Sequence, residues 1–308
     1  MSLQSKLEQF DKQADKLSDI TEKELIKAYS LALKEIRGYM AGVYEKHGTP
    51  DGLPYSEMQK YNRMKSLEEQ IKKVLFELTG KNAKTLEQTL KDIYELSYYS
   101  TGFALESESQ VKLSYAMINE EVVSQSVQNP ISGLTLNDRL EKNRIELIYR
   151  VRQEITQGLI LGESYQKMAK RLKDTFEGDA KKAVRVAQTE SHRIKNAARH
   201  ESMQHAQAKG IELKKKWIST LDKKTRDRHR QLDGQTVDLD KPFKIDGEEA
   251  MYPGGFPSAR NSVKCRCTFI SVLDGFEPTV KTARGEDGKT KVIPWTTYEE
   301  WYENRIKG

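Results

Sequence analysis

Most of the chain places apolar side chains three and four residues apart, which is the spacing of amphipathic helices. The first stripe has the a/d pattern of a helix that packs on a partner helix and comprises Leu3, Leu7, Phe10, Ala14 and Leu17. Thr21 and Glu24 fit a capping box, which predicts the start of a new helix. Its stripe continues to Tyr39 and stops at the Gly- and Pro-rich segment 47–54.

The same spacing predicts further helices along the first two thirds of the chain. They cover Glu57–Leu78, Thr85–Ser100, Ser109–Gln125, Asn137–Leu161, Glu163–Phe176 and Asp179–Lys209. Gly80 is expected to end the first of these helices. The stretch NPISG, residues 129–133, is the best internal candidate for a hinge or domain boundary.

After Gly210 the pattern changes to short alternating runs, KKKWIST and CTFISVL, separated by turn-forming residues. The sequence therefore predicts an α+β protein with a mostly helical, extended N-terminal region over residues 1–160 and a small mixed domain over 161–275. Residues 276–308 form a loop and an aromatic tail. We expect this tail to be helical and to dock on the chain's own core through Trp295, Tyr298, Trp301 and Tyr302.

Composition narrows the protein class. Charged residues make up 32% of the 308 residues and the mean hydropathy is −0.76, so apolar residues line narrow helix faces and an elongated shape is expected. No apolar run approaches the roughly 18 residues of a membrane span. The N-terminus has no secretory signal pattern, which predicts a cytosolic product. With two cysteines, a disulfide framework is excluded.

Positive charge is concentrated in one segment. The net charge is +6, and residues 209–230 hold nine Lys or Arg against three Asp or Glu, so this segment alone carries +6. Such a patch suits a phosphate backbone, although a solvated charged face gives the same pattern. The candidate DNA-binding residues are Lys214, Lys215, Lys216, Lys223, Lys224, Arg226, Arg228 and Arg230.

Several motifs follow one another between residues 187 and 273. They are AQTESHRIKNAARHE, then KKWISTLDKKTRDRHRQLDGQTVDLDKPF, then AMYPGGFPSARNSVKCRCTFIS. Their order resembles the phage Mu protein F-like family, in which a helix with a T-E pair precedes W-x-S-x-x-D-x-x-T-R-x-x-H-x-x-L-x-G and a closing C-R-C. The resemblance spans about 163–273. Gln188 stands where the family pattern leads us to expect arginine.

The resemblance implies a minor capsid protein, not an enzyme, present in a few copies inside the virion of a tailed phage. It implies binding to the portal oligomer and roles in head assembly and genome packaging or ejection, with the host cytoplasm as the place of assembly. Double-stranded DNA, a scaffold protein and other copies of the chain are further expected partners. The stripe from Leu3 to Leu17 is our preferred portal or self-association surface.

Two cysteines and a histidine suggest a metal site. His229 and Asp233 are four residues apart and would share one helix face, and Cys265 and Cys267 could complete four zinc ligands. A C-x-C pair on a strand points to one face, where free cysteines also pack as small apolar groups. Both interpretations, structural zinc and plain packing, remain open at this point.

Three other functions have partial sequence support. His229 among three arginines could serve a metal-dependent nuclease. Gln188 and Glu190 imitate the Q-x-E of ADP-ribosyltransferases, but within a predicted helix, and a host DNA-binding protein would also carry the basic patch. His192, His200 and His205 are not spaced as ligands, so we expect surface or interface histidines.

Overall fold

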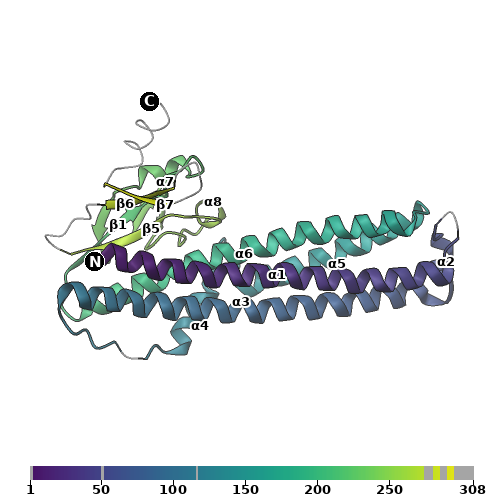
Figure 1. The fold of residues 1–308 in the computed structure, drawn as a ribbon, viewed down its shortest axis with the longest axis horizontal. Coiled ribbons are helices and arrows are strands. Elements are labelled where there is room, and N and C mark those ends of the chain that lie inside the picture. The colour runs from purple at the N-terminus through teal and green to yellow at the C-terminus, as the bar shows by residue number, and fades with distance from the viewer. Residues whose placement is uncertain (1–2, 50–51, 116, 274–279, 285–289, 295–308) are drawn as a thin grey trace. The chain divides into compact units, whose positions relative to one another are not determined.

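The computed structural model describes residues 3–49, 52–115, 117–273, 280–284 and 290–294, and it has the α+β architecture that the sequence predicts (Figure 1). The long helices are α1 (Leu3–His47), α3 (Arg63–Ser109), α5 (Leu136–Ile160) and α6 (Tyr165–Ala208). Short helices are α2 (Tyr55–Gln59), the 3-10 turn η1 (Lys60–Asn62), α4 (Glu120–Gln128), α7 (Asp227–Gln231) and α8 (Ala259–Ser262). No helix among the described residues is long and apolar enough to cross a membrane.

The residues pack into two compact units that do not follow chain order. We call residues 19–88 and 134–187 the helical unit, and residues 1–18, 89–133 and 188–308 the mixed unit. One crossing between the units falls directly after Gly133, the end of the NPISG stretch. The predicted boundary at 160/161 lies within the helical unit. Whether residues 1–160 fold apart from 161–275 stays a prediction.

The helices are longer than the sequence predicted. Thr21 is 3% exposed in the middle of α1, and Gly80 lies inside α3. The Glu163–Phe176 and Asp179–Lys209 helices are one helix, α6. The apolar stripes stay in phase at Thr21, at Gly80 and between Phe176 and Asp179. The free energy gained by burying these stripes exceeds the preference for a helix start at Thr21 and the roughly 1 kcal/mol that Gly80 costs inside a helix.

The predicted helix at Ser109–Gln125 is wrong in its first half. After α3 ends, residues 110–115 and 117–119 have no helical assignment, and Gln110 and Ser114 have positive φ. Leu113 is fully buried in this segment, so its apolar residues serve the core without a helix. Asn119 then caps α4 by accepting a hydrogen bond from the Glu121 amide.

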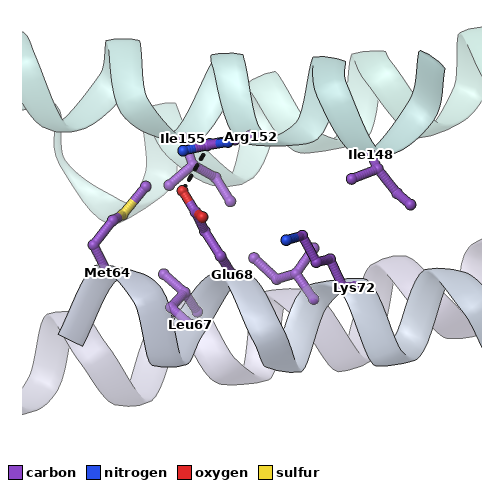
Figure 2. A pocket seen from close by; sticks show the side chains of 8 residues that line it. Met64, Leu67, Glu68, Lys72, Ile148, Arg152 and Ile155 are labelled. Atoms are coloured by element: carbon purple, nitrogen blue, oxygen red, sulfur yellow. Dashed lines mark ion pairs between the residues drawn. The ribbon is translucent and has the colours of Figure 1, made fainter. Parts of the chain in front are cut away.

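Packing of the apolar stripes of its helices stabilises the helical unit, and ion pairs lie at the edges of these stripes. Ile36, Leu75 and Leu147 are fully buried stripe residues of three different helices. On the flank of α3 and α5 a small pocket is lined by both helices, and Arg152 and Glu68 form an ion pair of 2.8 Å at its edge (Figure 2). Its lining comprises Met64, Leu67, Glu68, Ile71, Lys72, Ile148, Arg152 and Ile155.

The mixed unit contains three antiparallel strand groups. The main sheet has the order β2–β1–β5, with β1 (Leu213–Ile218) between β2 (Thr236–Asp238) and β5 (Thr268–Leu273). Two hairpins pair β3 (Phe243–Ile245) with β4 (Glu248–Ala250), and β6 (Val280–Arg284) with β7 (Thr290–Pro294). Trp217 on β1 is fully buried, as expected, and packs edge-on against Phe243.

The N-terminal stripe belongs to the core of the mixed unit. Leu7 and Ala14 are 3% and 2% exposed, and the Phe10 ring packs edge-on against Phe103 with centroids 6.3 Å apart. Leu7 and Ala14 are covered by their own chain, which removes them from the preferred portal or self-association surface, and the role of the rest of the stripe stays a prediction. The aromatic tail from Trp295 to Tyr302 lies outside the described residues.

Candidate functional site

A histidine and the two cysteines meet in the interior of the mixed unit. The Cys267 sulfur lies 3.4 Å, and the Cys265 sulfur 3.6 Å, from Nδ1 of His229. One possible ligand atom from each of the three side chains lies within 4.8 Å of those of the other two. The side chains are at most 3% exposed, so this group, which we call the Cys2His cluster, is closed to solvent.

Local structure places the histidine. His229 lies on α7, a five-residue helix without a side-chain N-cap bond. Its backbone carbonyl accepts a hydrogen bond of 2.6 Å from Ser219 Oγ, and its ring packs edge-on against Trp217 with centroids 5.8 Å apart. Contacts with Trp217 on β1 and with Ser219, directly after β1, thus position α7 so that the His229 ring lies beside the two sulfurs.

A sharp turn places the cysteines. Lys264 has a φ of 53°, and its amide donates to Thr189 Oγ1 on α6. The Cys265 amide donates to the Ser262 carbonyl directly after α8. Cys267 then precedes β5, so both sulfurs lie at the entry to the closing strand.

The structure does not bring the fourth predicted ligand into this cluster. Asp233 Oδ1 accepts a hydrogen bond of 2.6 Å from the Ser219 amide. The helix α7 ends at Gln231, so the predicted i, i+4 helical face shared with His229 does not extend to residue 233. The carboxylate instead fixes the chain that leaves β1.

The two thiols have opposite pKa shifts. Burial raises the pKa of Cys267, but hydrogen bonds with Cys265 and His229 outweigh it and hold the pKa well below its usual range. The hydrogen bond to Cys267, together with burial, raises the pKa of Cys265 well above its usual range. The cysteine nearer to the imidazole therefore has the stronger thiolate character.

A layer of buried and half-buried polar side chains on α6 lies beside this site, and the sequence analysis missed it. His192 Nε2 lies 2.7 Å from the Cys267 carbonyl oxygen, and Arg199 donates to the Phe269 carbonyl at 3.0 Å. His200 is 5% exposed and its Nε2 lies 3.2 Å from the Leu239 carbonyl oxygen. His205 lies 3.1 Å from the Leu113 carbonyl oxygen. The expectation of surface or interface histidines is wrong for His200, which is buried, whereas His192 and His205 are half-buried and also bond carbonyls within the unit.

The Q-x-E pair also lies in this layer. Glu190 is fully buried in mid-helix and pairs with Arg193 at 2.8 Å. Arg193 in turn donates to the carbonyls of Ser126 and Val127 in the last turn of α4. The Glu190 carboxylate pairs with Arg193 inside the protein, and its burial keeps it from contact with a dissolved substrate.

The predicted DNA-binding residues separate into three groups. Lys215 is fully buried and its ammonium donates at 2.9 Å to the carbonyls of Leu239 and Met251, so it cannot reach DNA. Lys216 is 9% exposed, which also removes it from the surface patch. Both belong to β1, whose central place in the sheet buries side chains on both faces. Lys214 is 62% exposed but lies 3.7 Å from Asp238.

The remaining five residues lie around α7. Lys223 and Lys224 are exposed, whereas Arg230 pairs with Asp227 at 3.0 Å and Arg226 donates to the Val263 carbonyl. An open surface groove beside α7 is lined by Arg226, Asp227, Arg228, Gln231, Asp246 and Arg260. Arg260 was missed because it lies 30 residues further along the chain, on α8. Asp246 faces Arg228 at 2.8 Å and partly neutralises this basic groove.

Comparisons with known proteins agree with the motif order. A family model described as phage Mu protein F like protein matches residues 149–270. The chain is 35% identical over 299 residues to the minor head protein GP7 of Bacillus phage SPP1, with 97% of each chain covered. It is 28% identical over 246 residues to the uncharacterized protein YqbB of Bacillus subtilis, covering 71% of this chain and 79% of that one.

A further relative carries an enzyme name. The chain is 33% identical over 287 residues to the NAD(+)–arginine ADP-ribosyltransferase EFV of Enterococcus faecalis, covering 93% of this chain. This chain spans only 58% of that protein, less than two thirds of its length. No solved structure matches the chain.

Proposed function

The chain belongs to the phage Mu protein F-like family, and from this premise we propose that it is a minor head protein that binds the portal oligomer and contacts packaged double-stranded DNA. The observation that carries the proposal is the 35% identity to a minor head protein over 97% of both chains. A virion location and a role in head morphogenesis follow from the same relationship. Mass spectrometry of purified virions tests it, because a host DNA-binding protein would be absent from them.

For the portal contact we propose the solvent face of α5 in the helical unit. Ile145 and Tyr149 lie one turn apart on this helix and are 59% and 64% exposed. Exposed apolar side chains at this spacing suit a helix that packs against a protein partner. Next to them in sequence, Ile148 lines the pocket between α3 and α5 (Figure 2).

Co-expression with the portal protein tests this contact. The double variant Ile145→Asp/Tyr149→Asp should lose portal co-purification, whereas Ile26→Asp/Leu31→Asp, which changes two exposed apolar side chains on α1, should retain it. Equal recovery of both variants would exclude this face.

For the DNA contact we propose Lys223 and Lys224 together with the basic groove beside α7. Neither lysine ammonium has a partner among the described residues, so both can approach phosphates without breaking an ion pair. Contacts of this kind release counterions and read no base sequence. Affinity for duplex DNA should therefore fall steeply as salt rises.

Matched charge removal tests the DNA contact. The double variant Lys223→Gln/Lys224→Gln should lower the slope of log affinity against log salt by about 2, one for each phosphate contact. The control Lys241→Gln/Lys244→Gln removes the same charge from lysines that are 64% and 68% exposed and already paired. If both doubles changed the slope equally, net charge and not this surface would determine binding.

We propose no catalytic activity for this chain, although a relative carries an ADP-ribosyltransferase name. Glu190 is buried and paired with Arg193, and about two fifths of that relative's length has no counterpart here. Incubation with labelled NAD and an arginine acceptor should give no label transfer above that of heat-denatured protein. A duplex DNA cleavage assay with magnesium or zinc tests the nuclease alternative in the same way, with His229→Ala as its control; cleavage that this variant loses would establish it.

A further inference from the structure

The Cys2His cluster has the distances of a tetrahedral metal site. Zinc at about 2.3 Å from sulfur and about 2.0 Å from nitrogen places those two ligand atoms about 3.5 Å apart when the geometry is tetrahedral. The two sulfur-to-Nδ1 distances here are 3.4 and 3.6 Å. The three side chains therefore already stand where one zinc ion could contact all of them.

The ligand atoms indicate which metal the cluster would bind, and their burial indicates whether the site is catalytic or structural. Thiolate and imidazole ligands favour zinc over magnesium or calcium, which prefer oxygen ligands. The three side chains are at most 3% exposed, and His229 also faces the rings of Trp217 and Phe256. A catalytic zinc keeps a position open to substrate, whereas a buried site of this type is structural.

The histidine has one further unusual feature. Its Nε2 is buried and has no hydrogen-bond partner among the described residues. Buried polar atoms are almost always paired, and the contacts of Nδ1 with the two sulfurs are the polar contacts that hold this ring among the described residues. Zinc bound at Nδ1 would fix the neutral tautomer that carries its proton on Nε2.

We propose that His229, Cys265 and Cys267 bind one structural zinc ion that fastens α7 to the entry of β5. The ladder between β1 and β5 ends at the pair Ile218–Thr268, one residue before Ser219 and one after Cys267. Beyond that pair the five-residue α7 is too short to be stable by itself. The zinc ion closes this end of the sheet. Asp233 stays outside because it holds the Ser219 amide.

Metal analysis of the full chain, purified without chelator and with any affinity tag removed, tests the proposal. We expect about one zinc ion per chain, retained by Asp233→Asn and by the histidine control His205→Gln, and largely lost from Cys265→Ser and Cys267→Ser. Loss of zinc from Asp233→Asn would overturn the three-ligand assignment in favour of a fourth protein ligand.

Measurements on the unmodified protein cover the case in which a cysteine variant fails to fold. Cobalt(II) added to metal-free protein should give the thiolate charge-transfer and visible bands of a tetrahedral site, and equimolar zinc should abolish them. A chelator should lower the melting temperature. Protein that contains no zinc, takes up none on reconstitution and shows no cobalt bands would overturn the proposal and leave plain packing as the role of the cysteines.

Discussion

Helix α6 contributes to both units, and its two parts bury their residues differently. In the helical unit its buried residues, such as Met168, Leu172 and Phe176, form one apolar stripe, and most other positions are partly or fully exposed. In the mixed unit nearly every position from Thr189 to His200 is buried, including charged residues. An apolar stripe needs only a neighbouring helix, whereas buried charges need partners at defined positions. The mixed unit therefore depends more strongly on individual polar side chains.

Ion pairs show the same difference. In the mixed unit Glu190 and Arg193 pair with 0% and 2% of their side chains exposed. In the helical unit Arg152 and Glu68 pair at the same distance of 2.8 Å, but Arg152 is 61% exposed. Solvent screens the second pair, and removing one partner there leaves the other free to contact water. Removing one partner of the first pair leaves a buried charge that has lost its ion-pair partner.

The largest expected effect comes from Arg193→Met. We expect it to lower the free energy of unfolding of the mixed unit by about 3–5 kcal/mol, because Glu190 and two α4 carbonyls lose their donor. Hydrogen exchange read by mass spectrometry assigns the loss to peptides of this unit. The matched control Arg152→Met should cost at most about 1 kcal/mol. Equal losses would show that burial does not separate the two units.

Acid should destabilise the mixed unit through its buried histidines. Burial lowers the pKa of His200 to about 4 and that of His192 to about 3, so both are neutral in the folded protein at pH 7. Below the unfolded pKa of about 6.5 the unfolded chain takes up the protons first, so stability falls as the pH falls from 6.5 toward 4. Each histidine contributes about 2–3 kcal/mol to this loss at pH 4.

Urea denaturation from pH 7 to pH 4 measures the acid effect. His200→Gln keeps a polar side chain that can bond the Leu239 carbonyl but cannot become charged. Its stability should depend less on pH than that of the unmodified protein over this interval. Identical slopes would show that groups other than His200 cause the acid loss.

The sequence predicts the helical unit well because its information is local. Apolar spacing alone identifies α5 to within one residue at each end. Helix ends at Thr21 and Gly80 were predicted wrongly because neighbouring stripes keep a helix intact where a local signal would end it. Such packing depends on residues far away in the chain, which spacing cannot reveal.

The candidate site divides in the same way. The C-x-C pair and His229 could be selected from residue type and motif order, and they do meet. Asp233 was added on the assumption that a helix continues past residue 231, and the helix ends first. Lys215 was assigned to the surface because it is charged, but its strand lies between two others and buries it. Arg260 is far from α7 in the sequence, and the fold brings it to the groove, so the sequence pattern could not reveal it.

The smallest expected effect concerns a site where the helical unit, like the mixed unit, buries a charged side chain. Asp179 is 1% exposed, pairs with Arg150, and accepts a hydrogen bond of 3.4 Å from the Tyr29 hydroxyl. Burial raises the pKa of Tyr29, so it stays a donor, and burial also raises the pKa of Asp179. Tyr29→Phe keeps the ring contact with Phe176 and removes only the hydroxyl, which should cost about 1 kcal/mol at pH 7.

The pH dependence of this loss identifies its cause. The Tyr29 hydroxyl stabilises the ionised carboxylate of Asp179, so the difference between Tyr29→Phe and the unmodified protein should shrink as the pH falls through the pKa of Asp179 and the carboxyl becomes neutral. Tyr39→Phe, which removes a hydrogen bond to Glu35 at the surface, should change nothing measurable. A loss that stays constant down to low pH would mean that the hydroxyl acts through packing, and this contact would then not resemble the buried polar pairs of the mixed unit.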